Sequence, residues 1–376
     1  MIPFARVLKY GNTVEPENTA IKKVACGQLH YCVLLENGKA YGIGYNNSKQ
    51  LKDCTATYQY GSFVLLAEDV VDIWCGNIST ILYLKDGRYI FNGNYNCMGT
   101  KAVDTLSTQE GDDITSSMPL YSTIKMMDIG VFQMHYLDIN GAVYGRGRNP
   151  NGTVGDGTRN VISAFKLVKS AIVDLYSGEF SSIFADADRL YGCGVSNYGE
   201  LGKPTTANNT IVQILPNTKP NFIGNRSSTI SYYASNTAAG AGWELYGALG
   251  NGVSTNTTKT AFSVYNIPGS GILKGARMRD GGSVRNLYLG VDRKVYSTGL
   301  DTYNGLGATS STFVAVPGLN ALDFSDETKV LITGGQTFGL IFDGTTLYGI
   351  GSYSFLPGKP LDNSLVKTFS KVETPK

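Results

Sequence analysis

A short phrase, Tyr-Gly-x-Gly or a near relative, recurs through the chain and limits its fold more than any other feature. The clear copies are Tyr41–Gly44, Tyr144–Gly147, Tyr191–Gly194 and Tyr348–Gly351. The weaker copies are Ile90–Gly93, Ala239–Gly242 and Tyr296–Gly299. The last glycines of the copies recur at intervals of 47 to 57 residues. A fixed period of this length is typical of a repeat architecture, so we interpret residues 1–376 as one domain of seven related units.

A second sequence pattern recurs at the same interval as the phrase. Shortly before it, several copies place an Asn-Gly or Asp-Gly pair between two apolar runs, at residues 37–38, 86–87, 140–141 and 343–344. This pair favours the type I′ turn of a β-hairpin, because both central residues of that turn need a positive φ. Each unit therefore contains at least one hairpin, with the phrase in its second strand.

Composition supports an all-β fold. The chain has 46 Gly and 24 Tyr, and only 16% of its residues are charged. Glycine suits tight turns and tyrosine suits half-buried strands. A small twisted sheet cannot bury both faces alone, whereas sheets stacked around an axis can. We therefore predict a seven-bladed β-propeller with about 50 residues per blade. A parallel β-helix is the rival fold, but its coils are shorter and lack an internal hairpin.

Two segments carry a resemblance to a known family. Residues 178–202, which end Leu-Tyr-Gly-Cys-Gly-Val-Ser-Asn-Tyr-Gly-Glu-Leu-Gly, resemble the repeat of the regulator of chromosome condensation family. The strand Val24-Ala25-Cys26-Gly27, with His30 three residues later, is similar to the strand and Gly-x-x-His of that family. The resemblance covers all seven units, clearly in the first, third, fourth and seventh, and loosely in the second, fifth and sixth. The pairs typical of WD and kelch propellers do not recur.

The resemblance implies a seven-bladed propeller closed by strands from the two chain ends, here Phe4–Leu8 and Leu365–Val372. Family members include nucleotide exchange factors, chromatin binders, a β-lactamase inhibitor and many bacterial and viral proteins. What they share is a protein partner bound on a propeller face or rim. Since function does not follow from fold, the resemblance implies a protein-binding role without naming the partner.

Charge argues against a nucleic-acid partner. The chain has 32 basic and 30 acidic side chains, for a net charge of +2. A protein that grips nucleic acid through its phosphates normally shows a basic stripe. The densest basic groupings here are only pairs: Lys22 with Lys23, Arg146 with Arg148, and Arg277 with Arg279. We therefore expect no nucleic-acid partner.

The chain also shows no sign of a membrane or secretory address. Its start, MIPFARVLKYGN, has no apolar core of a signal peptide. No stretch reaches the ~18 apolar residues that a membrane span needs. We therefore expect a soluble protein made in a cytoplasm, with no membrane partner.

No motif indicates a metal, a cofactor or catalysis. The six cysteines, at 26, 32, 54, 75, 97 and 193, include no CxxC pair, and the chain has two histidines. We expect the thiols to be small buried hydrophobes and predict no metal site. No P-loop is present, and no helix follows the Gly-x-Gly phrases, so no nucleotide or other small-molecule cofactor is expected. We predict that the chain is not an enzyme and has no catalytic residues.

The two histidines have a structural explanation. His30 lies three residues after Gly27, and His135 lies three after Phe132, which we place at the equivalent of that glycine. Ser79 and Ser181 hold the same place in other units. Because the repeat puts a polar residue there, we predict hydrogen-bonding roles for both histidines.

An aromatic residue follows the phrase in six of the seven copies, within four residues of the last glycine. These residues are Tyr45, Tyr95, Tyr198, Trp243, Tyr303 and Tyr353. Equivalent loops emerge on one face of a propeller, so these side chains form a candidate binding ring on that face. Packing under neighbouring loops is the alternative, and both interpretations stay open.

We predict a non-enzymatic interaction and assembly module whose partners are other proteins. The profile, poor in charge and rich in Asn, Thr, Ser, Gly and Tyr, resembles that of phage structural proteins, so we favour a bacteriophage particle, on its head, neck or tail surface. Virion proteins would then be its partners and the virion its location, after synthesis in the host cytoplasm. Two alternatives stay open: a cytoplasmic regulator or inhibitor that binds one protein, and a glycan-binding protein that contacts the host.

Overall fold

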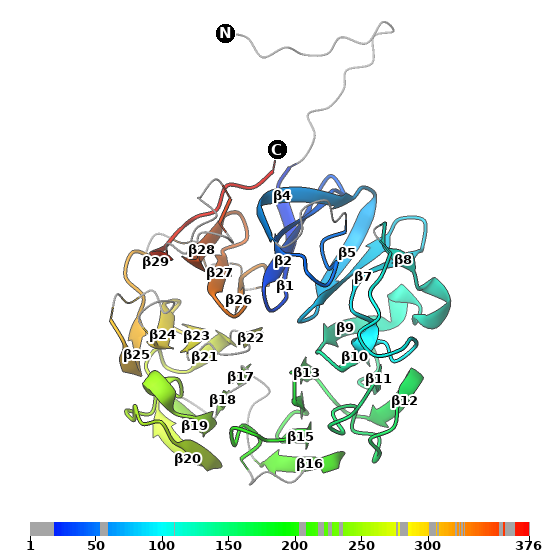
Figure 1. The fold of residues 1–376 in the computed structure, drawn as a ribbon. Helices are drawn as coiled ribbons and strands as arrows, with labels where there is room; N and C mark the ends of the chain where they lie inside the picture. Colours follow the sequence, from blue (N-terminus) through cyan, green and yellow to red (C-terminus); the bar gives the residue numbers. More distant parts are fainter. Residues whose placement is uncertain are drawn as a thin grey trace, which may run out of the picture.

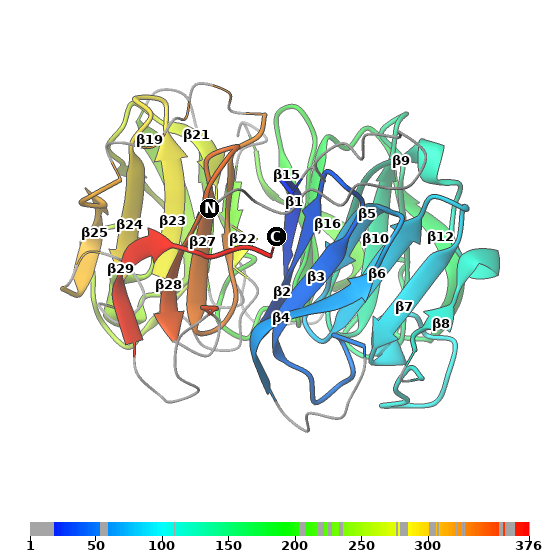
Figure 2. The ribbon, with the colours of Figure 1, turned by 90° about the horizontal axis from the view of Figure 1, so that it is seen from above.

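The computed structural model is an all-β propeller whose sheets stand around a central axis (Figure 1). It describes residues 19–375 except for 53–58, 109, 203–207, 217–221, 225–227, 233–235, 276, 279–284, 301–305, 307, 320–321, 323, 325, 327, 353–355 and 358–364. Seen from above in Figure 2, the strands run across the thickness of the ring. The propeller fold expected from the repeats is thus present.

Four sheets are up-and-down meanders taken in order from the first half of the chain. The first contains β1 (Ile21–Cys26), β2 (His30–Leu35), β3 (Ala40–Tyr45) and β4 (Gln59–Ala67). The second contains β5 (Val70–Cys75), β6 (Ser79–Leu84), β7 (Tyr89–Gly93) and β8 (Asp112–Asp113). The third contains β9 (Ile124–Ile129), β10 (Gln133–Asp138), β11 (Val143–Gly147) and β12 (Ile162–Lys169). The fourth contains β13 (Asp174–Ser177), β14 (Ser181–Ala185), β15 (Leu190–Gly194) and β16 (Asn208–Leu215).

The second half of the chain forms two further sheets. One has four strands: β21 (Ile272–Gly275), β23 (Arg285–Gly290), β24 (Val295–Gly299) and β25 (Ser310–Ala315). The other begins with β17 (Phe222–Gly224), β18 (Ser228–Tyr232), β19 (Thr237–Trp243) and β20 (Thr258–Asn266). It continues through β22 (Arg277–Met278) to β26 (Leu331–Gly334), β27 (Phe338–Phe342), β28 (Leu347–Ser352) and β29 (Leu365–Lys371).

The prediction of seven blades is wrong, because the described strands form six sheets. The difference arises at β22, which follows β21 near the axis and pairs in parallel with the inner strands β17 and β26. On one side, Gly224 pairs with Arg277, and on the other, Arg277 pairs with Thr333. These few hydrogen bonds join two four-stranded meanders into one nine-stranded sheet. The repeat phrases do not predict these hydrogen bonds.

The predicted hairpins are confirmed, but their turns are not of type I′. Gly38 has a φ of 83° and Gly87 a φ of 92°, whereas neither Asn37 nor Asp86 has a positive φ. Each glycine N–H instead closes a turn on the residue three positions earlier, Leu35 or Leu84. In the first turn, the Lys39 backbone N–H donates to the side-chain oxygen of Asn37 over 3.0 Å. These turns join the second and third strands of their sheets and fix the register between them.

The last glycine of the phrase is needed because two backbones approach closely at that point. The seven glycines have φ values from 99° to 139°. Gly147 is one of them and pairs with Gln133 of the neighbouring strand β10. A Cβ atom on Gly147 would lie 2.2 Å from the Phe132 carbonyl oxygen and 2.6 Å from the Gln133 Cα. Only glycine fits here, which explains why the phrase recurs.

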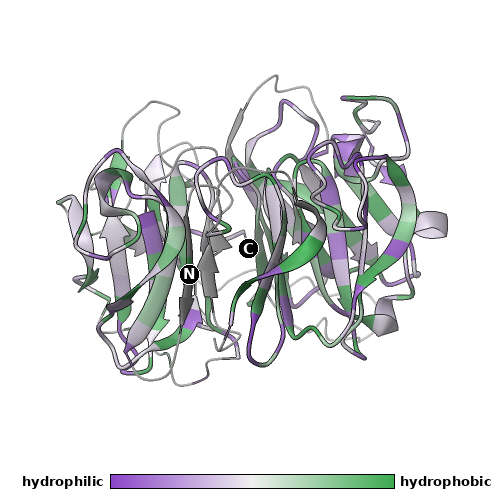
Figure 3. Ribbon diagram, turned by 90° about the horizontal axis from the view of Figure 1, so that it is seen from below, coloured by the Kyte–Doolittle hydropathy of each residue, from purple (hydrophilic) through white to green (hydrophobic). Residues whose placement is uncertain are grey.

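The core consists of apolar clusters between adjacent sheets, and one of them joins the two ends of the chain. Tyr31 of β2 packs against Phe338 of β27, with ring centroids 5.5 Å apart. The Gln336 N–H donates to the Gln28 carbonyl over 2.7 Å at the same junction. Figure 1 shows these first and last strands side by side, and Figure 3 shows hydrophobic stretches along the strands. Of the two predicted closing strands, Leu365–Val372 largely coincides with β29, which pairs with β28, and Phe4–Leu8 lies outside the described residues.

Among the described residues, helix is limited to short 3-10 turns in the connections. They are η1 (Tyr95–Cys97), η2 (Thr115–Ser117), η3 (Tyr121–Thr123) and η4 (Leu245–Gly247). No helix in the described part of the chain has the length and apolarity to cross a membrane.

Candidate functional site

A cavity of about 750 Å³ lies at the centre of the propeller. It is lined by the inner strands β1, β5, β9, β13, β21 and β26. Much of the lining is apolar, with Val24, Met126, Leu273 and Leu331 among its side chains. A concave, partly apolar surface with a few polar groups is the usual form of a binding site.

Charged residues of both signs line this cavity. Five of them are, in chain order, Lys23 of β1, Asp72 of β5, Lys125 of β9, Asp174 of β13 and Lys274 of β21. A sixth, Asp128, is buried, and its carboxylate accepts the Ser177 N–H over 2.6 Å. The Lys23 ammonium lies 2.6 Å from an Asp72 carboxylate oxygen. Lys125 is exposed. We call these five residues the charged ring. It offers hydrogen-bond donors and acceptors of both signs to whatever enters the cavity.

We did not recognise the charged ring from the sequence, although a signal exists. Lys23, Asp72, Lys125 and Asp174 each lie four or five residues before a glycine that follows an inner strand, so they recur at the period of the repeat. Among the described lining residues there is no histidine or serine. The cavity therefore offers polar and apolar contacts, but no hydroxyl–imidazole pair of the kind that activates a nucleophile.

The register corrects one of the two histidine assignments. The glycine that matches Gly27 in the third sheet is Gly130, whose N–H bonds to the Gln133 carbonyl just as the Gly27 N–H bonds to the His30 carbonyl. Gln133 therefore holds the place of His30, and His135 lies two residues further along. The prediction that Phe132 replaces the glycine is wrong, because Phe132 lies in the turn between β9 and β10.

The hydrogen-bonding role predicted for His135 is confirmed. The fully buried ring bonds to the Ser177 hydroxyl over 2.9 Å and to the Val154 carbonyl over 3.1 Å. Burial lowers the pKa of His135 to about 4, although the bond to Val154 acts in the opposite direction. The ring is therefore neutral at neutral pH and links the third sheet to the fourth.

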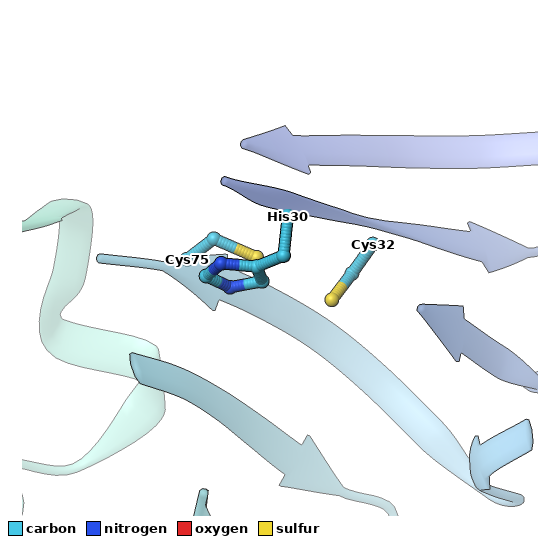
Figure 4. Close-up of side chains that lie close together, drawn as sticks. All are labelled: His30, Cys32 and Cys75. Atoms are coloured by element: carbon cyan, nitrogen blue, oxygen red, sulfur yellow. The ribbon is translucent and has the colours of Figure 1, made fainter. Parts of the chain in front are cut away.

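His30 also bonds across a sheet junction, and there it meets two thiols. Its Nε2 lies 3.0 Å from the Thr80 hydroxyl of the second sheet. The ligand atoms of His30, Cys32 and Cys75 lie within 4.8 Å of one another (Figure 4). Burial raises the pKa of the Cys32 thiol, which also lies beside Cys75. Burial also acts to raise the pKa of Cys75, but the neighbouring Cys32 and His30 side chains outweigh it and hold this pKa well below its usual value.

The described cysteines are the free, buried thiols that we expected: Cys26, Cys32, Cys75, Cys97 and Cys193. Cys54 lies outside the described residues. The meeting of Cys32 and Cys75 was missed, because 43 residues separate them in the chain. The repeat register was the available signal, since it places both at the junction of the first and second sheets.

The structure describes four of the six candidate aromatic residues and brings two of them together. The Tyr198 and Trp243 rings stack with centroids 5.4 Å apart. Tyr95 is buried and donates to Asp112 over 2.8 Å, and Tyr45 is partly buried against the apolar cluster at the chain ends. Tyr303 and Tyr353 lie outside the described residues. The binding role of these residues stays a prediction.

Removing the Trp243 ring tests the contact with Tyr198. We expect Trp243→Ala to lower the free energy of unfolding by about 1–3 kcal/mol, because the stack and the buried ring area are lost. The loss is read from urea denaturation of the purified chain. Tyr246→Ala, at an exposed side chain of η4, is the control and should change stability by less than about 0.5 kcal/mol. Equal stability of the two variants would contradict a packing role for Trp243.

Comparison with known proteins places this geometry in context. The model of the regulator of chromosome condensation (RCC1) repeat matches residues 21–50. Prp20p from Saccharomyces cerevisiae, studied for its binding to Gsp1p and histones, has a similar structure, with a TM-score of 0.68 over 84% of this chain and 80% of Prp20p, at 13% identity. The fold is an RCC1-like β-propeller.

Two further proteins are similar to this chain, one in structure and one in sequence. Human WBSCR16 has a TM-score of 0.66 over 85% of each chain, at 16% identity. The ultraviolet-B receptor UVR8 of Arabidopsis thaliana is 25% identical over 257 residues, which cover 64% of this chain and 57% of the receptor. The chain thus matches less than two thirds of the length of that relative. At these identities the solved structures are evidence for the fold alone.

Proposed function

We propose that this chain is a non-enzymatic protein-binding module that holds its partner at the central cavity. The observation that carries the proposal is a cavity lined by both the charged ring and apolar side chains, presented by the inner strands of the propeller. A surface on strands is held rigidly, so little ordering is needed when a partner docks.

The balance of charge favours a polypeptide over a polyanion. Lys23, Lys125 and Lys274 are offset in the cavity by Asp72, Asp128 and Asp174. A phosphate backbone would meet carboxylates there, whereas a polar loop of a protein carries donors and acceptors for both signs. The basic pair at 146 and 148 adds no phosphate-binding patch, because Arg146 is fully buried.

Protein partners are also described for a protein of similar fold. Prp20p of yeast binds Gsp1p and histones, and Kap60 has been seen bound to the same yeast protein. By analogy we assign a protein partner to this chain. Its identity is not carried over, because the sequence identity is only 13%.

The setting we propose is a bacteriophage particle, and it rests on composition alone. Gradient sedimentation of material from the native source, followed by mass spectrometry, tests it. Migration with large particles beside capsid or tail proteins supports the setting. Migration near the 40.4 kDa of the free chain, or with one cellular protein, contradicts it and favours the regulator.

Charge reversal in the ring tests the contact surface. We expect the double variant K125E/K274E to weaken capture of the co-purifying partner by at least tenfold, because two complementary contacts become repulsive. Capture is measured with the immobilised chain and the partner identified by mass spectrometry. The matched control is K371E on β29, an exposed lysine of the outer rim, which should bind as the parent chain does. An equal loss of partner binding in both variants, or full binding by the double variant, would contradict the proposal.

A further inference from the structure

The junction between the first and second sheets contains four polar or sulfur side chains. His30 and Cys32 lie two residues apart on β2 and therefore point to the same side of that strand. Cys75 ends β5, and Thr80 belongs to β6. Their side chains are buried, with relative exposures of 0%, 0%, 4% and 0%. Figure 4 shows His30 and Cys32 on one strand facing Cys75 on another.

The same four positions recur between the third and fourth sheets, where they form an ordinary hydrogen-bond network. There, Gln133 donates to the Ser182 hydroxyl over 3.2 Å and to the Gly178 carbonyl over 2.8 Å. His135 bonds to Ser177 and to Val154, so both ring nitrogens have partners. Thus Gln133, His135, Ser177 and Ser182 correspond in register to His30, Cys32, Cys75 and Thr80.

At the first junction the hydrogen bonding is incomplete. The Nε2 of His30 bonds to Thr80, and its Nδ1 is buried with no hydrogen-bond partner among the described residues. The amide of Gln133, the imidazole of His135 and the hydroxyl of Ser177 are replaced at the first junction by one imidazole and two thiols. Imidazole nitrogen and cysteine sulfur are weak partners for each other as neutral groups, but they are the preferred ligands of Zn²⁺.

The separations fit a four-coordinate ion. The Thr80 hydroxyl oxygen lies 3.0 Å from His30 Nε2, 3.9 Å from Cys32 Sγ and 3.8 Å from Cys75 Sγ. Metal–sulfur bonds of about 2.3 Å and metal–nitrogen bonds of about 2.0 Å put tetrahedral ligands roughly 3.3 to 3.8 Å apart. The three ligand atoms of His30, Cys32 and Cys75 lie within 4.8 Å of one another, so closing on an ion takes shifts of about 1 Å or less.

Charge also suits an ion here. Two thiols that lose their protons on binding would carry two negative charges, which neutralise a divalent cation and leave the buried site without net charge. Cys75 is also one of the residues that line the central cavity. No other group of three or more His, Cys, Asp or Glu side chains in the described part of the chain is arranged in this way.

We propose that His30, Cys32 and Cys75 form a site for Zn²⁺, with the Thr80 hydroxyl at the fourth position. The ion would tie the first sheet to the second. This site departs from our sequence-based prediction of no metal, which relied on the absence of a CxxC pair and on the presence of only two histidines. It does not depend on the proposed protein-binding function.

Metal binding to the whole chain tests the site directly. We expect reduced, purified chain to retain about one Zn²⁺ per molecule after dialysis against a weak chelator, measured by elemental mass spectrometry. Co²⁺ used as a spectroscopic probe should produce thiolate charge-transfer absorption and the visible bands of tetrahedral cobalt. A parent chain that retains no Zn²⁺ and shows no thiolate–cobalt band would overturn the proposal.

Single substitutions assign the ligands. We expect C32S and C75S each to abolish the thiolate–cobalt spectrum or weaken cobalt binding by at least tenfold. The matched control, C193S, changes an equally buried free cysteine outside the cluster and should keep the parent spectrum. A spectrum retained by both C32S and C75S contradicts the assignment. So does a Cys32–Cys75 disulfide found by peptide mapping of chain purified without reductant. If C75S fails to fold, the measurement on the parent chain still decides the question.

Discussion

Replacing Arg146 with leucine is expected to lower the free energy of unfolding by about 3–5 kcal/mol. This arginine is fully buried in β11. It donates to the carbonyls of Met98 over 2.9 Å, of Ser117 over 2.9 Å and of Ser163 over 2.5 Å. Leucine would leave these three acceptors without their donor. Urea denaturation followed by circular dichroism measures the loss.

Arg148 provides the matched control, because it lies two residues away and is partly exposed. We expect Arg148→Leu to change stability by less than about 0.5 kcal/mol. Burial lowers the pKa of Arg146 to about 10, so the side chain remains charged at neutral pH. Equal stability of the two variants would show that Arg146 does not join the second and third sheets as its hydrogen bonds indicate.

The second large effect is expected at Gly351, the last glycine of the final repeat phrase. Its φ is 116°, and a Cβ there would lie 2.1 Å from the Thr337 carbonyl oxygen and 2.7 Å from the Phe338 Cα. Gly351→Ala therefore combines backbone strain with a backbone clash, and we expect a loss of at least about 3 kcal/mol. The urea midpoint is again the measurement.

Gly157 separates the two contributions. It also has a positive φ, of 88°, but a Cβ there would meet nothing within 4 Å. Gly157→Ala should therefore show the strain alone, about 1 kcal/mol. If the two alanine variants lost the same stability, the close approach of backbones would not be the reason for the recurring phrase.

The local structure of this protein follows closely from its repeats. Asn-Gly and Asp-Gly pairs mark hairpin turns, and the last glycine of each phrase marks a close backbone contact, because both depend on neighbours in the same unit. The number of sheets depends instead on β22, a two-residue strand that pairs in parallel with strands distant in the sequence. No local signal encodes such a pairing, so the sequence predicted seven blades where the described strands form six sheets.

The candidate sites likewise divide into those that local sequence predicts and those that depend on contacts between sheets. The aromatic residues after the phrase were found by counting along the chain, whereas the charged ring and the His30 cluster depend on which positions face each other across sheet junctions. The misplacement of His135 by two residues illustrates the difficulty. Choosing Phe132 instead of Gly130 as the matching position concealed the correspondence between His135 and Cys32.

Cross-linking mass spectrometry of the chain bound to its partner from the native source tests the central claim most directly. An amine-reactive cross-linker should join the partner to Lys23, Lys125 or Lys274 at the central cavity, with few links to Lys166 or Lys371 on the outer strands. Links confined to the outer strands, with Lys125 unmodified by the partner, would contradict binding at the cavity.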